Sequence, residues 1–122
     1  MAKVLVIDDD EVILDVVTLM LGQEGLEVVT ARNGKDGLRA FDTTIDLVVT
    51  DVIMPEKEGL ETIMSLRKQN PDLPIICISG GGRNTPQSYL KIAEQLGANS
   101  IMAKPFARLD FVNEVKRLLQ RQ

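Results

Sequence analysis

Residues 3–13 read KVLVIDDDEVI, and this stretch decides the fold. Its first half, Lys3 to Asp8, is a short run rich in β-branched residues and favours a β-strand. Asp9 or Asp10 can then cap a helix, because a carboxylate accepts a hydrogen bond from the first helical turn. Apolar residues recur after the cap with helical spacing, at Ile13, Val16, Val17, Met20 and Leu21. The stretch therefore predicts a strand that leads directly into an amphipathic helix.

The same alternation of apolar runs and helical patterns continues along the chain. Further strands are predicted over residues 26–31, 46–51, 74–79 and 99–103, and further helices over residues 35–41, 59–69, 87–96 and 109–119. Strands with continuous apolar runs are typical of a parallel sheet that is covered on both faces. We therefore expect an α/β fold, a (βα)5 doubly wound parallel five-stranded sheet, as a single domain over residues 1–122.

Composition excludes several classes of function. The chain has 14 basic and 18 acidic residues, a net charge of −4, and only 3% aromatic residues. Binding of nucleic acid by this domain is not expected, since it needs clustered cations or a stacking platform. The sequence has one Cys and no His, so an internal disulfide and imidazole chemistry are excluded. No apolar run approaches the ~20 residues of a membrane span, and we expect a cytoplasmic domain with no membrane partner.

Ligands of doubly wound sheets bind outside the carboxyl ends of the strands. The residues predicted at these ends are Asp8, Asp9, Asp51, Ser79 and Lys104. Three carboxylates at one edge repel one another, so a cation has to compensate them, either Mg²⁺ or Lys104. Asp51 could act as a nucleophile and form an aspartyl-phosphate. Lys104 and Ser79 would then contact two of the phosphoryl oxygens.

Four segments, VLVIDDDEVI, DLVVTDVIMPEKEG, ICISGGG and IMAKPF, together resemble the response-regulator receiver domain of two-component signalling. The resemblance covers the whole chain and implies the flavodoxin-like strand order 2-1-3-4-5. It implies that Asp51 is the phosphoacceptor, Ser79 the switch hydroxyl and Lys104 the lysine of the family's site. It also implies a cis Lys104-Pro105 peptide bond. The Mg²⁺ ligands that it implies are Asp8, Asp9, Asp51 and the backbone carbonyl of Ile53.

The resemblance implies a signalling mechanism with no external substrate, in which the domain catalyses its own phosphorylation and dephosphorylation. The phosphoryl donor would be a histidine kinase, a phosphotransfer protein or a small acyl phosphate. Ser79 would move to the phosphoryl group, and Phe106, the switch aromatic, could rotate into the space vacated beneath the fourth helix. Since Phe106 stands where Tyr is commoner, this switch would depend on packing alone. The face formed by the fourth helix, fifth strand and fifth helix would then control an unknown output protein or a fused effector domain.

Alternative interpretations remain. A haloacid-dehalogenase-type phosphatase would use Asp8 as nucleophile and Asp10 as acid or base, but it would give Asp51 no role. A flavodoxin-like flavin binder would meet repulsion between its phosphate and the acidic loop after the first strand. A phosphorylation-independent pseudo-receiver would not need the complete set of acidic, hydroxyl and lysine residues. The loop at Gly80–Gly82 is either a tolerated insertion or a partner-specific segment.

Overall fold

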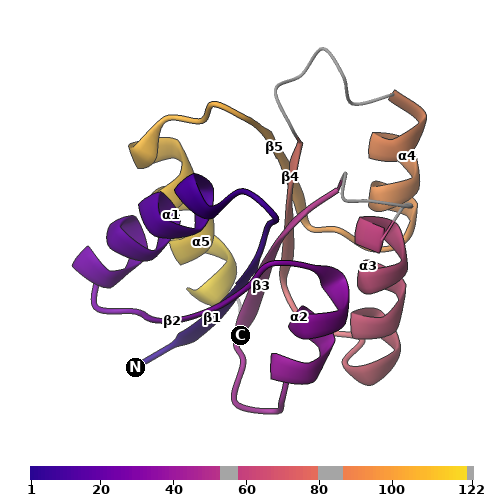
Figure 1. Ribbon diagram of the computed structural model, residues 1–122, viewed down its shortest axis with the longest axis horizontal. Helices are drawn as coiled ribbons and strands as arrows, with labels where there is room; N and C mark the ends of the chain where they lie inside the picture. The colour runs from indigo at the N-terminus through magenta and orange to yellow at the C-terminus, as the bar shows by residue number, and fades with distance from the viewer. Residues whose placement is uncertain (53–57, 80–86, 121–122) are drawn as a thin grey trace.

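The computed structural model describes residues 1–52, 58–79 and 87–120 of the chain. Strands and helices alternate along it, as predicted (Figure 1). The strands are β1 (Lys3–Ile7), β2 (Glu27–Ala31), β3 (Leu47–Asp51), β4 (Ile75–Ser79) and β5 (Ser100–Ala103). The helices are α1 (Glu11–Gln23), α2 (Gly34–Ala40), α3 (Glu58–Gln69), α4 (Gln87–Gln95) and α5 (Arg108–Gln120). None of the described helices is both long and apolar enough to cross a membrane.

The five strands form one sheet in the order β2-β1-β3-β4-β5, and every pair is parallel. This confirms the predicted fold class and strand order. Because all strands run the same way, their carboxyl ends lie along a single edge of the sheet. The register places Asp51 of β3 beside Ile78 of β4, and Ser79 beside Ala103 of β5. The sheet therefore brings residues far apart in sequence to one edge.

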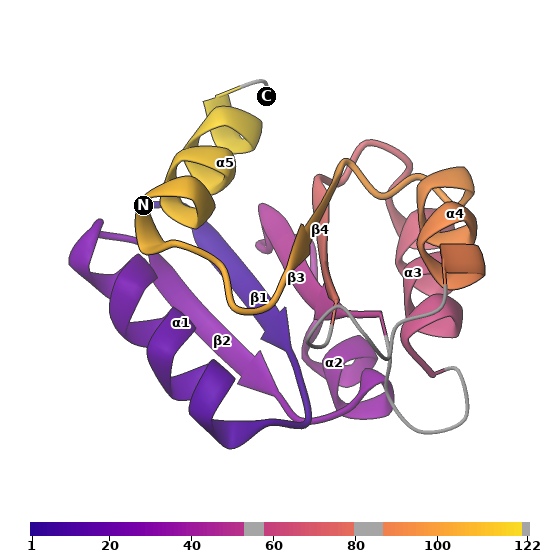
Figure 2. The ribbon, with the colours of Figure 1, turned by 90° about the horizontal axis from the view of Figure 1, so that it is seen from above.

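The helices cover both faces of the sheet. α1 and α5 lie on one face, and α2, α3 and α4 lie on the other (Figure 2). Alternate residues of each strand enter two separate cores, as the period of two requires. In β4, Cys77 belongs to the core on the α2–α4 face, while Ile76 and Ile78 belong to the core on the α1–α5 face. This burial on both faces explains the continuous apolar runs of the strands.

Two helices expose an apolar residue that helical spacing places beside buried ones. In α1, the buried residues are Leu14, Val17 and Leu21, while Val16 is 40% exposed. In α3, Met64 is 45% exposed although helical spacing places it beside the buried Ile63. α1 carries apolar residues around most of its circumference, so their spacing does not define a unique buried stripe.

The N-terminus of α1 begins at the predicted acidic cap. Asp10 is the capping residue, and the backbone N–H of Val12 donates to its Oδ1 atom at 2.9 Å. The same turn fixes the first part of the site, because the backbone N–H of Asp10 donates to Oδ1 of Asp8, also at 2.9 Å. The cap and the site are therefore built from one loop.

Candidate functional site

Three carboxylates meet at the carboxyl edge of the sheet. Asp8 directly follows β1 and Asp51 ends β3, and both are buried, whereas Asp9 is exposed. Each of the three residues offers a carboxylate oxygen that lies within 4.8 Å of those of the other two. The sheet thus brings together the acidic residues that the sequence predicted to share one site.

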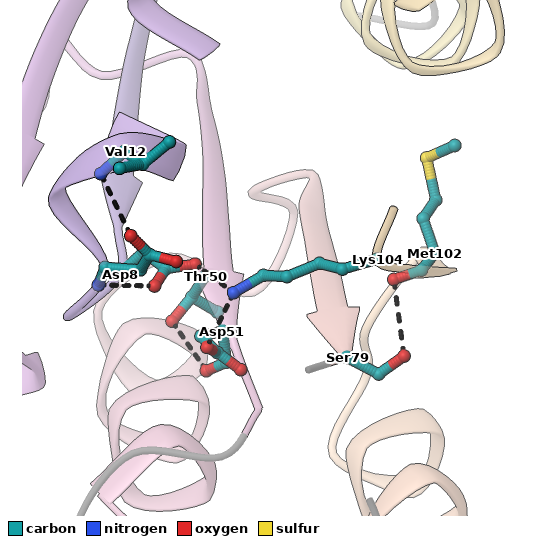
Figure 3. A network of polar contacts seen from close by, with 8 residues as sticks. Asp8, Val12, Thr50, Asp51, Ser79, Met102 and Lys104 are labelled. Carbon is teal, nitrogen blue, oxygen red and sulfur yellow. Dashed lines mark hydrogen bonds and ion pairs between the residues drawn. The ribbon is translucent and has the colours of Figure 1, made fainter. Parts of the chain in front are cut away.

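Lys104 supplies the positive charge of this site. Its Nζ atom lies 2.7 Å from Oδ2 of Asp8 and 3.1 Å from Oδ2 of Asp51 (Figure 3). Lys104 directly follows β5, and its backbone N–H donates to the carbonyl of Ser79 at 2.9 Å. One ammonium group therefore bridges two buried carboxylates that come from β1 and β3.

Burial and charge act in opposite directions within this cluster. Burial raises the pKa of Asp8, and the hydrogen bond from Lys104 offsets this only in part. Burial lowers the pKa of Lys104, but the hydrogen bond to Asp8 and the charges of Asp51 and Asp8 outweigh it, so that the net direction is upward. Lys104 is therefore held as a cation, while the charged form of Asp8 remains costly. Further positive charge would stabilise the site.

The carboxylates can hold a divalent cation. Three carboxylate oxygens close together are hard donors of the kind that Mg²⁺ binds, and Mg²⁺ keeps several waters besides one or two carboxylates. Asp9 is exposed, which leaves room for such waters on the outer side of the site. The predicted backbone ligand, Ile53, lies outside the described residues.

Close backbone packing positions Asp51, and sequence motifs did not reveal it. The Thr50 hydroxyl is buried and donates to the carbonyl of Asp51 at 3.2 Å. Gly59 lies so close that a Cβ atom there would stand 2.2 Å from the carbonyl oxygen of Val52 and 2.6 Å from that of Asp51. Glycine is therefore required where α3 approaches the end of β3. In the sequence, the only sign of this close approach was a glycine, Gly59, shortly after Asp51.

Ser79 ends β4 at the same edge and is 3% exposed. Its hydroxyl donates to the carbonyl of Met102 in β5 at 3.5 Å, a long hydrogen bond (Figure 3). Alternation along β4 places its side chain on the same face as Cys77, the face covered by α2, α3 and α4. Ser79 thus links the site edge to β5 from the α4 side of the sheet.

Phe106 does not lie where it could rotate into the space beneath α4. Its ring stacks on that of Phe111, with centroids 4.8 Å apart, and packs against the core on the α1–α5 face. Ser79 and α4 lie on the opposite face, so the sheet separates Phe106 from the space beneath α4. On β5, Ile101 packs against the core on the α4 side. The Lys104-Pro105 peptide bond is cis, as predicted, while the loop at Gly80–Gly82 lies outside the described residues.

Comparisons with known proteins agree with this geometry. The family model of the response regulator receiver domain matches residues 4–116. The transcriptional regulatory protein CpxR of Escherichia coli is 32% identical over 99% of this chain and 50% of its own length. The chain thus spans about half the length of the curated relatives it matches.

Solved structures show the same likeness. A CheY-like receiver domain from Methanospirillum hungatei has a TM-score of 0.91 and 26% identity, covering 99% of this chain and 95% of that one. The chemotaxis protein CheY4 of Vibrio cholerae has a TM-score of 0.85 and 30% identity, covering 97% and 98% of the two chains. With its acidic site at the end of the sheet and a family match over nearly its whole length, the chain belongs to the response regulator receiver domain family of two-component systems.

Proposed function

We propose that this domain accepts a phosphoryl group on Asp51 and, through the resulting change in the surface formed by α4, β5 and α5, controls an output partner. The observation that carries the proposal is the bridging position of Lys104, 3.1 Å from Asp51 and 2.7 Å from Asp8. A buried carboxylate beside a fixed ammonium and two further acids is suited to phosphoryl transfer, which depends on positioning and charge stabilisation.

In the proposed reaction, a carboxylate oxygen of Asp51 attacks the phosphorus atom of the donor. A phosphorus–oxygen bond forms to Asp51, and the bond between phosphorus and the donor's imidazole nitrogen, or the acyl oxygen of a small acyl phosphate, breaks. The leaving group takes the electron pair. Lys104 would pair with a phosphoryl oxygen, and Ser79 would donate a hydrogen bond to another. Because the sequence contains no His, a phosphohistidine donor lies outside it, on a histidine kinase or phosphotransfer protein.

Asp8, Asp9 and Asp51 would hold Mg²⁺ in this proposal, together with the backbone carbonyl of Ile53. When bound, the ion would offset the negative charge on the phosphoryl oxygens. The residues of the chain supply the remaining requirements. Thr50 and Gly59 fix the backbone at Asp51. Lys104 keeps its charge because Asp8 and Asp51 raise its pKa by more than burial lowers it.

The proposed output runs through Ser79 to β5. Movement of its hydroxyl from the Met102 carbonyl to the phosphoryl group would release a contact between β4 and β5. The curated relatives include transcriptional regulatory proteins of about twice this length. The output partner is accordingly either an effector domain in the same polypeptide or a separate protein.

Intact-mass measurement with acetyl phosphate and Mg²⁺ tests the proposal. The wild-type protein should gain one phosphoryl group, and chelation of Mg²⁺ with EDTA should prevent the gain. Asp51→Asn should abolish it, whereas Asp15→Asn, at an exposed position of α1, should leave it unchanged. Phosphate that persists in Asp51→Asn would contradict the proposal. If peptide mapping then placed it on Asp8, the phosphatase alternative would be supported instead.

A further inference from the structure

Arg67, close to the end of α3, makes several contacts that no sequence motif indicates. Its Nη1 atom donates to the carbonyls of Asn70, Pro71 and Leu73, at 3.2, 2.8 and 2.7 Å. Its Nη2 atom donates to the carbonyl of Gly97, at 2.7 Å. The first three carbonyls belong to the connection between α3 and β4, and the fourth follows α4. One guanidinium therefore joins two loops at the amino edge of the sheet.

These contacts are strong because the guanidinium is partly desolvated and bound mainly by backbone. Hydrogen bonds from a charged donor are about twice as strong as neutral ones. Within the described residues, Arg67 forms no salt bridge with a carboxylate, and its Nε atom is buried without a hydrogen-bond partner. Burial lowers the pKa of Arg67. The four carbonyls are therefore what holds this charge in place.

The end of α4 is fitted closely around Arg67. Gly97 has a φ of +103°, and a Cβ atom there would lie 2.9 Å from Nε of Arg67. The backbone N–H of Gly97 donates to the carbonyl of Glu94, and that of Ala98 donates to the carbonyl of Ala93, both at 3.0 Å. Asn99 then donates to the carbonyl of Ile75 in β4. The C-terminal end of α4 is thus closed by its own cap and tied to α3 and β4.

The adjoining part of α4, residues 91–95, buries few side chains. Among residues 91–95, only the small side chain of Ala93 is buried, and Ile92 is 39% exposed. α4 lies beside α3 on one face of the sheet (Figures 1 and 2). A segment with few buried apolar contacts opens at low free-energy cost. In this stretch the helix is weakly packed, while its end is bound strongly.

We propose that Arg67 is a positioning residue that makes the C-terminal end of α4 a fixed pivot, about which the body of α4 moves relative to the sheet. The pivot exists with or without phosphorylation. Its use in signalling rests on the proposed function, because α4 belongs to the proposed output surface.

Amide hydrogen exchange, followed by NMR in the unphosphorylated protein, tests the pivot. In an isolated helix the amides at the ends exchange fastest. A pivot at Gly97 should instead make the C-terminal end of α4 exchange more slowly than the residues before it. We expect the amides of residues 91–93 to exchange at least about tenfold faster than those of Leu96 and Ala98. Equal rates in the two groups, or faster exchange at Ala98, would overturn the proposal.

Three variants assign the effect to Arg67. Arg67→Met keeps an unbranched apolar chain but removes the donors, and should speed exchange at Leu96 and Ala98 by about tenfold or more. Lys68→Met, the same change at the exposed neighbouring residue, should alter neither amide. Arg67→Lys guards against unfolding of the Met variant. The single ammonium group of lysine cannot donate to both loops. The Arg67→Lys variant should therefore keep the Leu73 amide protected from exchange and lose the protection of the Ala98 amide.

Unchanged exchange in the strands would show that local release, and not global unfolding, causes the effect. If Arg67→Met and Lys68→Met affected Ala98 equally, Arg67 would not be the anchor.

A second measurement, with beryllium fluoride and Mg²⁺ as the phosphoryl mimic, tests the use of the pivot. Exchange should then change at residues 91–93 and stay constant at Leu96 and Ala98. If no amide responded in an Asp51-dependent manner, the proposed function would fail, while the first measurement would still decide the pivot.

Discussion

At Asp8, the charge that a cation site needs is costly for the stability of the fold. Its carboxylate is buried, and burial raises its pKa despite the ion pair with Lys104 at 2.7 Å. An acid whose pKa is raised by folding favours the folded state only while it is protonated. That contribution is fully present at low pH and is lost as the pH rises through the raised pKa. The charged site is thus kept at a cost that a bound cation would reduce.

We therefore predict that Asp8→Asn increases the free energy of unfolding at pH 7 in EDTA. The amide has the same shape but carries no charge, and we expect a gain of about 1 kcal/mol. The gain should shrink as the pH is lowered towards 4, because the wild-type carboxylate then becomes protonated. Urea unfolding measured across this pH range would check it, with the exposed Asp15→Asn as the matched control.

Mg²⁺ should reduce this difference in stability between Asp8→Asn and the wild-type protein. In the proposed function the ion binds the folded wild-type site, so it should raise the wild-type free energy of unfolding more than that of Asp8→Asn. A loss of stability in Asp8→Asn at pH 7 without Mg²⁺ would mean that the ion pair with Lys104 outweighs burial, contrary to the direction of the pKa.

Gly59 provides a second prediction at this scale. A methyl group there would lie 2.2 Å from the carbonyl oxygen of Val52, so that α3 would have to shift away from the end of β3. We expect Gly59→Ala to lower the free energy of unfolding by about 1–3 kcal/mol. It should also slow phosphorylation of Asp51 by acetyl phosphate, because small displacements of a nucleophile are costly.

The same substitution at Gly22, inside α1, is the matched control. Apart from Gly22, its chain neighbours and the nearby backbone of its own helix, no atom lies within 4 Å of a Cβ built at Gly22. Alanine also favours a helix, so a gain of up to about 1 kcal/mol is expected there. Urea unfolding and initial phosphorylation rates would measure both variants. Equal phosphorylation rates in Gly59→Ala and the wild-type protein would show that the close approach of α3 does not position Asp51.

At the scale of elements, polar contacts tie β5 to α5 on the proposed output surface. The Ser100 hydroxyl donates to a carboxylate oxygen of Glu114, and Arg117 donates to both oxygens of Glu114, at 2.8 and 2.7 Å. The hydrogen bonds from Arg117 chiefly lower the pKa of Glu114, to about 2. An acid with a lowered pKa stabilises the fold above its unfolded pKa and loses this effect as the pH falls through the folded value.

Glu114→Gln should therefore lower the free energy of unfolding at pH 7 by about 1 kcal/mol, since the group is partly exposed and screened by solvent. The difference from the wild-type protein should begin to shrink below the ordinary Glu pKa, 4.5, and vanish near pH 2. Thermal unfolding at several pH values would measure it, with the exposed Glu61→Gln as control. A difference that stayed constant down to pH 2 would point to lost packing and not to lost charge.

The elements also show what sequence could and could not predict. Strand positions followed from apolar runs, and Asp8, Asp51 and Ser79 were placed correctly because parallel strands end at one edge. The buried face of α1 was placed incorrectly at Val16, since an apolar surface on several sides leaves the helix rotation undetermined. Arg67 was missed for a different reason. Its partners are backbone carbonyls, which every residue has, so no side-chain pattern marks them.

For the whole molecule, the two residues of the expected switch lie on opposite faces of the sheet. Ser79 lies on the α4 side, and Phe106 stacks on Phe111 on the α1–α5 side. The family resemblance implied that both residues belong to one switch, and it did not distinguish the two faces of the sheet. We therefore expect a change at Asp51 to reach β5 first through Ser79 and the carbonyl of Met102, to which the Ser79 hydroxyl donates, without any rotation of Phe106.

This route predicts that Ser79→Ala separates phosphorylation from switching. Asp51 and Lys104 remain in place in this variant, so phosphoryl transfer should continue, although more slowly because one hydrogen bond to the phosphoryl group is lost. NMR amide shifts induced by beryllium fluoride and Mg²⁺ should persist beside Asp51 but decrease in β5 and α5. Ser79→Thr keeps the hydroxyl and should restore them, whereas Ser65→Ala on α3 should resemble the wild-type protein. Full shifts in β5 and α5 of Ser79→Ala would contradict the route, because the change would then reach the output surface without the hydroxyl that joins β4 to β5.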